Sequence, residues 1–395
     1  MTGVDAFTAR NAIECLRAGA PNQTVVELLG SGQPRIEDAF SRLLTAVRGG
    51  ATTGLSVGGG FGAGKSHLLA ALRQRALREG FAVSMVVISK ETLLSDPCKV
   101  ASAALATAAA RERRGPLLAD IAAELSPANR AHADLRRWAE DPASGLDSRF
   151  AATLHLHAHA HGVDDVLTDA VVRFWSGDSL PAADLTRALR ANGLPATGFR
   201  RVHPAELARQ RLRFAQRLMA AAGYCGWIVL FDEVELIGRC TPAQRARSYA
   251  EIARWTGGSL GGPAAIGSVF AITEDFAAAV LDGKGDRSSL AGRAQWAEQP
   301  AELVAEGMRV IDRDTLLLDR PDADRLRQVY RRVRELHGTA FNWNPPNVRG
   351  LPGASTHQFR QHIRGWINEW DLLRLDPDYR PDTLLDTEAH DYSHA

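Results

Sequence analysis

The glycine-rich segment of residues 58–66, GGGFGAGKS, constrains this chain more than any other part of its sequence. Its spacing Gly59-x-x-x-x-Gly64-Lys65-Ser66 matches the GxxxxGK[ST] pattern, between an apolar run typical of a strand and a helical pattern. Glycines let backbone amides line a concave anion site, and the following helix directs its positive end to the same place. A glycine-rich turn that caps a helix, with a solvated Lys65, is the alternative, but the flanking strand and helix favour a phosphate-binding loop.

The side chains at the end of this segment have the chemistry of a nucleotide site. Lys65 supplies a point charge for the β- and γ-phosphates, and the hydroxyl of Ser66 is a ligand for Mg²⁺. ATP and Mg²⁺ are therefore the expected cofactors. The residues expected to bind the nucleotide are Gly59, Gly60, Phe61, Gly62, Ala63, Gly64, Lys65, Ser66 and His67.

A second apolar run, WIVLFDEVE, ends in acidic residues. At the carboxyl end of a parallel strand, Asp232 can hold Mg²⁺ through water, and Glu233 can polarise an attacking water as a general base. Glu235 has the same chemistry, but it is expected to point elsewhere if the strand continues. An acidic loop after a strand is the alternative, yet next to a phosphate-binding loop the two features complete one phosphoryl-transfer site.

A third apolar run, SVFAIT, ends at Thr273. If this strand lies beside the other two, the hydroxyl of Thr273 faces the γ-phosphate and orients the attacking water. A polar strand terminus that caps the next helix is the open alternative.

The succession of strand, helix and strand between residues 51 and 89 predicts a parallel α/β sheet flanked by helices. Roughly 140 residues with helical patterns lie between the second strand and Asp232, far more than an ordinary connection needs, which predicts a large helical insertion. The expected units are N-terminal helices at 1–50, an α/β core at 51–99 and 206–320, a helical insertion at 100–205, and a helical lid with a tail at 321–395.

The order of these features resembles that of AAA+ ATPases, on the branch of initiator and STAND-like ATPases, over roughly residues 30–375. Several segments of the chain resemble the BREX phage-defence ATP-binding protein family (BrxD). These segments are NAIECLRAGAPN, GGFGAGKSHLL, VVISKETLLSDPCKV, the DEVE strand and INEWDLLR. This resemblance implies a P-loop AAA+-type ATPase that acts as a motor or switch in bacterial anti-phage defence. Other BREX-type proteins, a methyltransferase and a helicase-like protein among them, are the implied partners.

The AAA+ resemblance also implies two arginines near the γ-phosphate. One comes from a neighbouring subunit, which implies a homo-oligomer. Arg293 lies in about the right segment for it, with Arg287 as its rival. The other comes from the start of the last lid helix, where Arg360 is the candidate and Arg364 lies one turn later. Solvated helix faces are the alternative for all of these arginines.

Hydrolysis is one of two hypotheses for such a site. In the other, ATP binds tightly, turnover is negligible, and the bound state licenses assembly, as in a nucleotide-gated scaffold or DNA-binding adaptor. A DNA contact would use RQRLRFAQR, the basic amphipathic helix of residues 209–217, which could track a phosphate backbone. A solvated face paired with acidic neighbours is the alternative for this helix.

The run HLHAHAH places His155, His157, His159 and His161 at a spacing of two. On a strand these side chains would share one face and could hold a metal. The flanks predict a helix, however, on which residues two apart do not face each other. A polar helix face is therefore expected.

Composition indicates the compartment. The net charge of +1 gives no bulk attraction to nucleic acid or to membranes. The N-terminus lacks the apolar centre of a signal peptide, and no stretch reaches the ~20 apolar residues of a membrane span. Four cysteines without a CxxC pair suit a reducing compartment. We therefore expect a cytoplasmic protein without a membrane partner.

Overall fold

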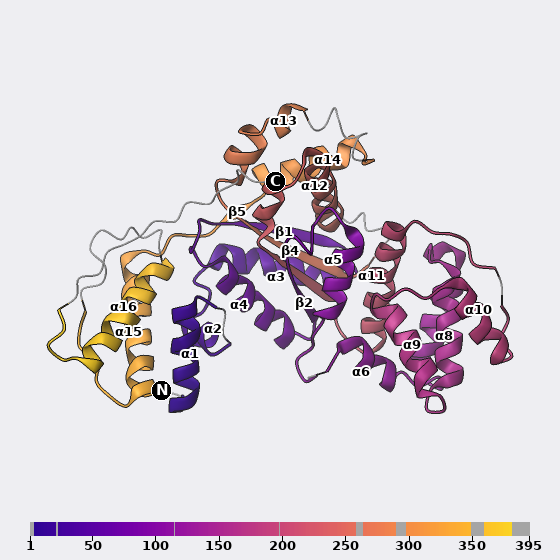
Figure 1. Cartoon of the computed structure of the whole chain (residues 1–395), viewed down its shortest axis with the longest axis horizontal. Helices are drawn as coiled ribbons and strands as arrows, with labels where there is room; N and C mark the ends of the chain where they lie inside the picture. The colour runs from indigo at the N-terminus through magenta and orange to yellow at the C-terminus, as the bar shows by residue number, and fades with distance from the viewer. Residues whose placement is uncertain are drawn as a thin grey trace.

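The computed structural model describes residues 4–20, 23–113, 115–196, 198–257, 264–289, 298–348 and 359–380. At the centre lies a five-stranded, all-parallel sheet in the order β2-β3-β4-β1-β5 (Figure 1). Its strands are β1 (Thr53–Gly58), β2 (Ala82–Val87), β3 (Trp227–Asp232), β4 (Ile266–Ile272) and β5 (Leu316–Leu317). The prediction of a parallel α/β sheet flanked by helices is confirmed.

The strand order brings distant parts of the chain to one edge of the sheet. β4 lies between β1 and β3, and in the parallel register Gly58 pairs with Ile272 while Val87 pairs with Asp232. Because all strands run in one direction, their carboxyl ends share one edge. In sheets of this kind, ligands bind beyond that edge.

Helices cover both faces of the sheet, which explains why its strands are almost uninterrupted apolar runs. On one face, Phe40 of α3 (Pro34–Arg48) and Leu69 of α4 (Lys65–Arg78) are fully buried in a core with Ile228 of β3. The next residues of β3 alternate, so Val229 and Phe231 belong to the core on the other face. The helices in that second core include α5 (Pro97–Ala106), α11 (Pro204–Ala221), α12 (Pro242–Gly257) and α14 (Ala301–Arg313).

A lobe of helices is inserted between β2 and β3 and extends to one side of the sheet (Figure 1). Between α5 and α11 it contains α6 (Leu117–Glu124), α7 (Arg130–Glu140), the 3-10 helix η1 (Pro142–Ser144), α8 (Ser148–Ala160), α9 (Asp165–Ser176) and α10 (Ala182–Ala191). Phe150 and Phe214 pack in its centre with ring centroids 5.0 Å apart. The regular elements of this insertion in the described part of the chain are helices, and Ala109 adds an isolated antiparallel bridge to Val83 of β2. No described helix of the protein is long and apolar enough to cross a membrane.

A third core lies beside the sheet and packs helices from the first 29 residues against helices of residues 323–375 (Figure 1). Its helices are α1 (Ala6–Ala18), α2 (Gln23–Leu29), α15 (Ala323–Phe341) and α16 (Phe359–Leu375). Ile13, Val333 and Trp370 are buried between them. The segment 1–50, expected as one N-terminal unit, thus contributes to two cores: α1 and α2 pack with the lid helices, whereas α3 packs on the sheet.

Candidate functional site

The glycine-rich loop (residues 59–66) connects the end of β1 to the first turn of α4. Gly62 and Gly64 have φ angles of 74° and 107°, a left-handed region that glycine enters without steric cost. The N–H of Gly59 donates to the carbonyl of Ile272 at 3.2 Å, which ties the loop to the end of β4. Strand, turn and helix N-terminus therefore follow in the order of the motif, and the positive end of α4 can stabilise an anion in the loop.

Lys65, the first residue of α4, is folded against the loop and buried. Its Nζ donates to the carbonyl of Gly59 at 2.9 Å and to that of Gly60 at 3.5 Å. The same Nζ lies 3.5 Å from Oε1 of Glu235. The ammonium group is thus held between backbone carbonyls and a carboxylate.

Of the predicted acidic residues, Asp232 ends β3 at the carboxyl edge of the sheet and Glu233 follows it directly. Asp232 is buried, and its Oδ1 accepts the N–H of Glu233 at 2.9 Å. Glu233 has a φ of 59°, a left-handed conformation that is uncommon for a residue with a side chain. The chain therefore leaves the strand at this point and continues as a 3-10 helix, η2 (Val234–Arg239).

Glu235 lies inside the site because of this turn. The sequence predicted that Glu235 points away from the site if the strand continues. The strand does not continue, because β3 ends at Asp232. Glu235 is 2% exposed and meets Lys65. Burial raises the pKa of Glu235, and the nearby Lys65 opposes that shift.

Thr273 follows β4 directly and is 4% exposed. Because β4 pairs with β1 on one side and with β3 on the other, Thr273 lies between the glycine-rich loop and the acidic end of β3. The next residue also reaches the loop, since Oε1 of Glu274 lies 3.3 Å from the position that a Cβ on Gly60 would take. The strand arrangement on which the predicted role of Thr273 depends is present.

Arg360 lies in the first turn of α16 and contacts the glycine-rich loop. Its backbone N–H donates to the carbonyl of Gly62 at 3.4 Å, and the Cζ of its side chain lies 5.7 Å from the ring centroid of Phe61. Arg364, one turn later, is exposed. Of these two lid arginines, Arg360 is therefore the one beside the loop.

The arginines considered for a neighbouring subunit's site belong to the segment around α13 (Asp286–Ser289). Arg293 lies in residues 290–297, outside the described residues. Its rival Arg287 forms ion pairs within its own chain, with Asp282 at 2.8 Å and with Asp312 at 2.7 Å.

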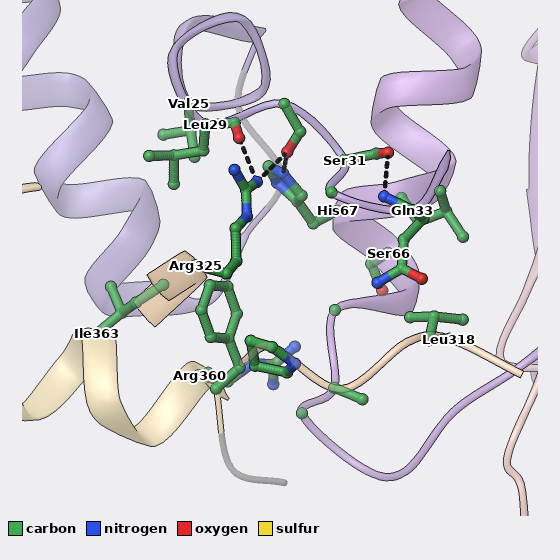
Figure 2. Close-up of a pocket in the computed structure, with 18 of the residues that line it drawn as sticks. Val25, Leu29, Ser31, Gln33, Ser66, His67, Leu318, Arg325, Arg360 and Ile363 are labelled. Atoms are coloured by element: carbon green, nitrogen blue, oxygen red, sulfur yellow. Dashed lines mark hydrogen bonds between the residues drawn. The ribbon is translucent and has the colours of Figure 1, made fainter. Parts of the chain in front are cut away.

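A cavity of about 390 Å³ lies beside the glycine-rich loop (Figure 2). This volume is within the range of ~300–1,000 Å³ typical of small-molecule sites. Apolar side chains, among them Leu29, Leu318 and Ile363, line it together with the polar His67 and Arg325. Its walls thus come from the loop and α4, from the connection between α2 and α3, and from the lid.

Hydrogen bonds between distant segments hold these walls together. Arg325 donates to carbonyls at the end of α2, and Nε2 of His67 lies 2.8 Å from the carbonyl of Gly30 (Figure 2). Burial lowers the pKa of His67. The Gln33 amide donates to the carbonyl of Asp319 at 3.0 Å and accepts the N–H of the same residue at 2.7 Å. Of these residues, the motif predicted only His67. Arg325 and Gln33 could not be predicted, because each binds a segment almost 300 residues away in the sequence.

The basic stretch of residues 209–217 lies on α11, and its central arginines are turned into the protein. Arg211 and Arg213 are 7% and 5% exposed. Arg211 donates to the carbonyl of Asp178 at 3.0 Å, and Arg213 to that of Ser144 at 2.7 Å. The buried guanidinium groups of Arg211 and Arg213 cannot track a phosphate backbone, so they give no support to the suggested DNA contact, and Arg217 is the exposed arginine of this stretch.

The histidine run lies on α8 and at its end, so it is helical as its flanks predict. His157 is fully buried, and its Nε2 lies 3.0 Å from the carbonyl of Ala122. Burial lowers the pKa of His157 to about 4. In the described parts of the chain, no three His, Cys, Asp or Glu side chains are grouped so that they could hold a metal ion.

Comparison with known proteins identifies one family. The family model of the BREX system ATP-binding protein BrxC/D matches residues 4–106 and 144–387. These segments contain the glycine-rich loop, the acidic end of β3, Thr273 and Arg360. No curated protein and no solved structure matches the chain.

Proposed function

Because this chain belongs to the family of BREX system ATP-binding proteins BrxC/D, we propose that it is an AAA+-type ATPase that works as a nucleotide-driven motor or switch in phage defence. The family implies ATP binding and a role in that defence. Hydrolysis is supported above all by one arrangement. Lys65 of the glycine-rich loop and the carboxylates of Asp232 and Glu233 lie at the same edge of the sheet, with only β4 between their strands.

The glycine-rich loop binds the triphosphate in this proposal. Backbone amides of the loop and the N-terminus of α4 surround the anion, and Lys65 contacts the β- and γ-phosphates. The hydroxyl of Ser66 and, through water, the carboxylate of Asp232 would hold Mg²⁺, which prefers such oxygen ligands. A metal ion held there would supply positive charge next to the transferred phosphoryl group.

The nucleoside occupies the cavity beside the loop. One wall is formed by the loop and the first turn of α4, and the opposite wall by α1, α2 and the lid helices. A nucleotide in this cavity therefore contacts both the glycine-rich loop with α4 and the lid helices. Closure of the lid on the nucleotide is the movement that transmits the nucleotide state to partner proteins.

The residues at the carboxyl edge act on the γ-phosphate. Glu233 takes a proton from the attacking water, and Thr273 orients this water. Arg360 stabilises the developing charge from the lid, and Arg293 does so from a neighbouring subunit in a homo-oligomer. The partners of this assembly are other BREX-type proteins, a helicase-like protein among them.

Phosphate release from ATP tests hydrolysis. It is measured with the protein alone, with DNA, and with the other proteins of its BREX system. We expect Mg²⁺-dependent turnover that Glu233→Gln abolishes without loss of ATP binding, whereas Lys65→Ala weakens binding itself. Glu302→Gln, which removes an exposed charge on α14, is the control and keeps wild-type turnover.

A wild-type protein that binds ATP but releases no phosphate under any of these conditions would contradict the ATPase. That result would instead support the nucleotide-gated scaffold, in which the bound nucleotide licenses assembly and is not consumed.

A further inference from the structure

Lys65 and Glu235 form a buried ion pair within the proposed phosphate site. Nζ lies 3.5 Å from Oε1, and the two side chains are 9% and 2% exposed. A lysine ammonium group has three N–H donors, and the other acceptors beside it are the carbonyls of Gly59 and Gly60. The group that would meet the phosphates is thus surrounded by acceptors of its own chain.

The backbone fixes Glu235 in this position. The left-handed conformation of Glu233 ends β3, and η2 then begins at Val234. Val234 and Ile237, on either side of Glu235 in η2, are 0% and 1% exposed. The packing of η2 therefore keeps Glu235 in the buried part of the site, where it is 2% exposed.

The contact with Lys65 compensates for the burial of the Glu235 carboxylate. Among the described residues, Oε2 of Glu235 has no hydrogen-bond partner, although it is buried. A buried carboxylate with few partners destabilises the folded protein, and losing the partner that remains destabilises it further. The raised pKa of Glu235, caused mainly by burial, agrees with this environment.

We propose that Glu235 is a positioning residue that occupies Lys65 in the empty site and competes with the β- and γ-phosphates for its ammonium group. The inference rests on the proposed function, because it requires the phosphates to bind at the glycine-rich loop. Phosphate binding must then break the ion pair between Lys65 and Glu235, and the free energy needed for this lowers the net free energy of binding. Glu235 thereby sets the affinity for nucleotide, although it is not expected to contact it.

Direct measurement of nucleotide affinity tests this competition. Glu235→Gln keeps the shape of the side chain and removes its charge. In calorimetry with the full chain, we expect the Kd for ATP and for ADP to fall about tenfold, the factor that 1.4 kcal/mol produces. The Kd for AMP stays unchanged, because AMP has neither a β- nor a γ-phosphate. The matched control Glu302→Gln removes an exposed charge and leaves all three values at the wild-type level.

A second variant separates charge from position. Glu235→Asp keeps the charge but withdraws it by one methylene group, so its affinity for ATP should lie between those of the wild type and Glu235→Gln. Thermal unfolding verifies that each variant folds.

Three outcomes overturn the proposal. The first is an unchanged or weaker affinity for ATP in both folded variants. The second is an equal gain for AMP, which would indicate a general change in the cavity. The third is a wild type that binds no ATP at all, which overturns the proposed function and this inference with it.

Discussion

Arg360 of the lid places its guanidinium group over the ring of Phe61 in the glycine-rich loop, with Cζ 5.7 Å from the ring centroid. Phe61 is 49% exposed, so this contact lies at the surface of the site. The guanidinium also lies close to the end of α1, since a Cβ on Gly19 would lie 3.0 Å from its Nε. A cation–π contact at an exposed site is worth about 0.5–1 kcal/mol, little enough for a phosphate to replace it.

Arg360→Ala is therefore expected to lower ATP turnover about a hundredfold or more, while ADP binding changes little. An arginine that stabilises the transferred phosphoryl group acts on the γ-phosphate, which only ATP carries. Steady-state phosphate release and calorimetry with ADP measure the two effects. Arg364→Ala is the control, because Arg364 lies one turn later on α16 and is exposed. An equal loss in both variants would mean that Arg360 acts through the folding of α16.

Local sequence patterns were sufficient to predict the centre of this fold. Each strand of the sheet has its own apolar run, and alternation with helices dictates a parallel arrangement. The glycine-rich loop also follows from local spacing, because Gly62 and Gly64 occupy the two left-handed positions in it. The predicted nucleotide-binding segment, Asp232 and Thr273 therefore all belong to elements that the sequence identifies.

Contacts between distant segments could not be predicted in the same way. The apolar face of α1 could pack on many surfaces, and only the folded chain places it against α15, where Arg10 contacts the carbonyl of Ala340. The position of Glu235 depends on the left-handed backbone conformation of Glu233. Because this conformation is uncommon for residues other than glycine, the sequence does not predict it. The burial of Arg211 likewise depends on a distant partner, the carbonyl of Asp178 just after the end of α9.

A buried ion pair anchors α13 to α12. Arg245 binds the two carboxylate oxygens of Asp286 at 2.6 and 2.5 Å, and the hydroxyl of Tyr249 donates to the same carboxylate at 2.8 Å. Removal of one partner leaves the other charge buried without compensation. Asp286→Ala is therefore expected to lower the free energy of unfolding by about 3–5 kcal/mol, measured by urea denaturation.

The exposed ion pair between Arg287 and Asp312 provides the control for this prediction. Asp312→Ala should cost no more than about 1 kcal/mol, because solvent screens such pairs. Similar small losses in both variants would contradict the structural role of the buried pair.

Gly307 of α14 allows a close approach to α12. A Cβ at this position would lie 1.9 Å from the carbonyl oxygen of Tyr249, so an alanine forces the two helices apart. We expect Gly307→Ala to lower the free energy of unfolding by about 3 kcal/mol or more. Gly257→Ala is the matched control, since no described atom lies within 4 Å of its Cβ position, and its effect should stay near zero. If the two variants unfold at the same midpoint, the close packing of α14 on α12 is disproved.

His157 makes the stability of the helical lobe depend on pH. Burial lowers its pKa to about 4, while its contact with the carbonyl of Ala122 opposes that shift and the nearby His161 and His132 favour it. In the unfolded chain the pKa of a histidine is about 6.5. Between these values the unfolded state binds more protons than the folded state, so stability is present above pH 6.5 and falls as the pH falls towards 4.

His157→Gln keeps a side-chain N–H for Ala122 and removes the titration. Between pH 7.5 and pH 5, the wild type should lose about 2 kcal/mol more free energy of unfolding than this variant. Urea denaturation at the two pH values measures the difference. His159→Gln, on the exposed side of the same helix, should retain the pH dependence of the wild type. If His157→Gln retains it as well, the acid sensitivity arises elsewhere, and the buried ring of His157 does not control the lobe.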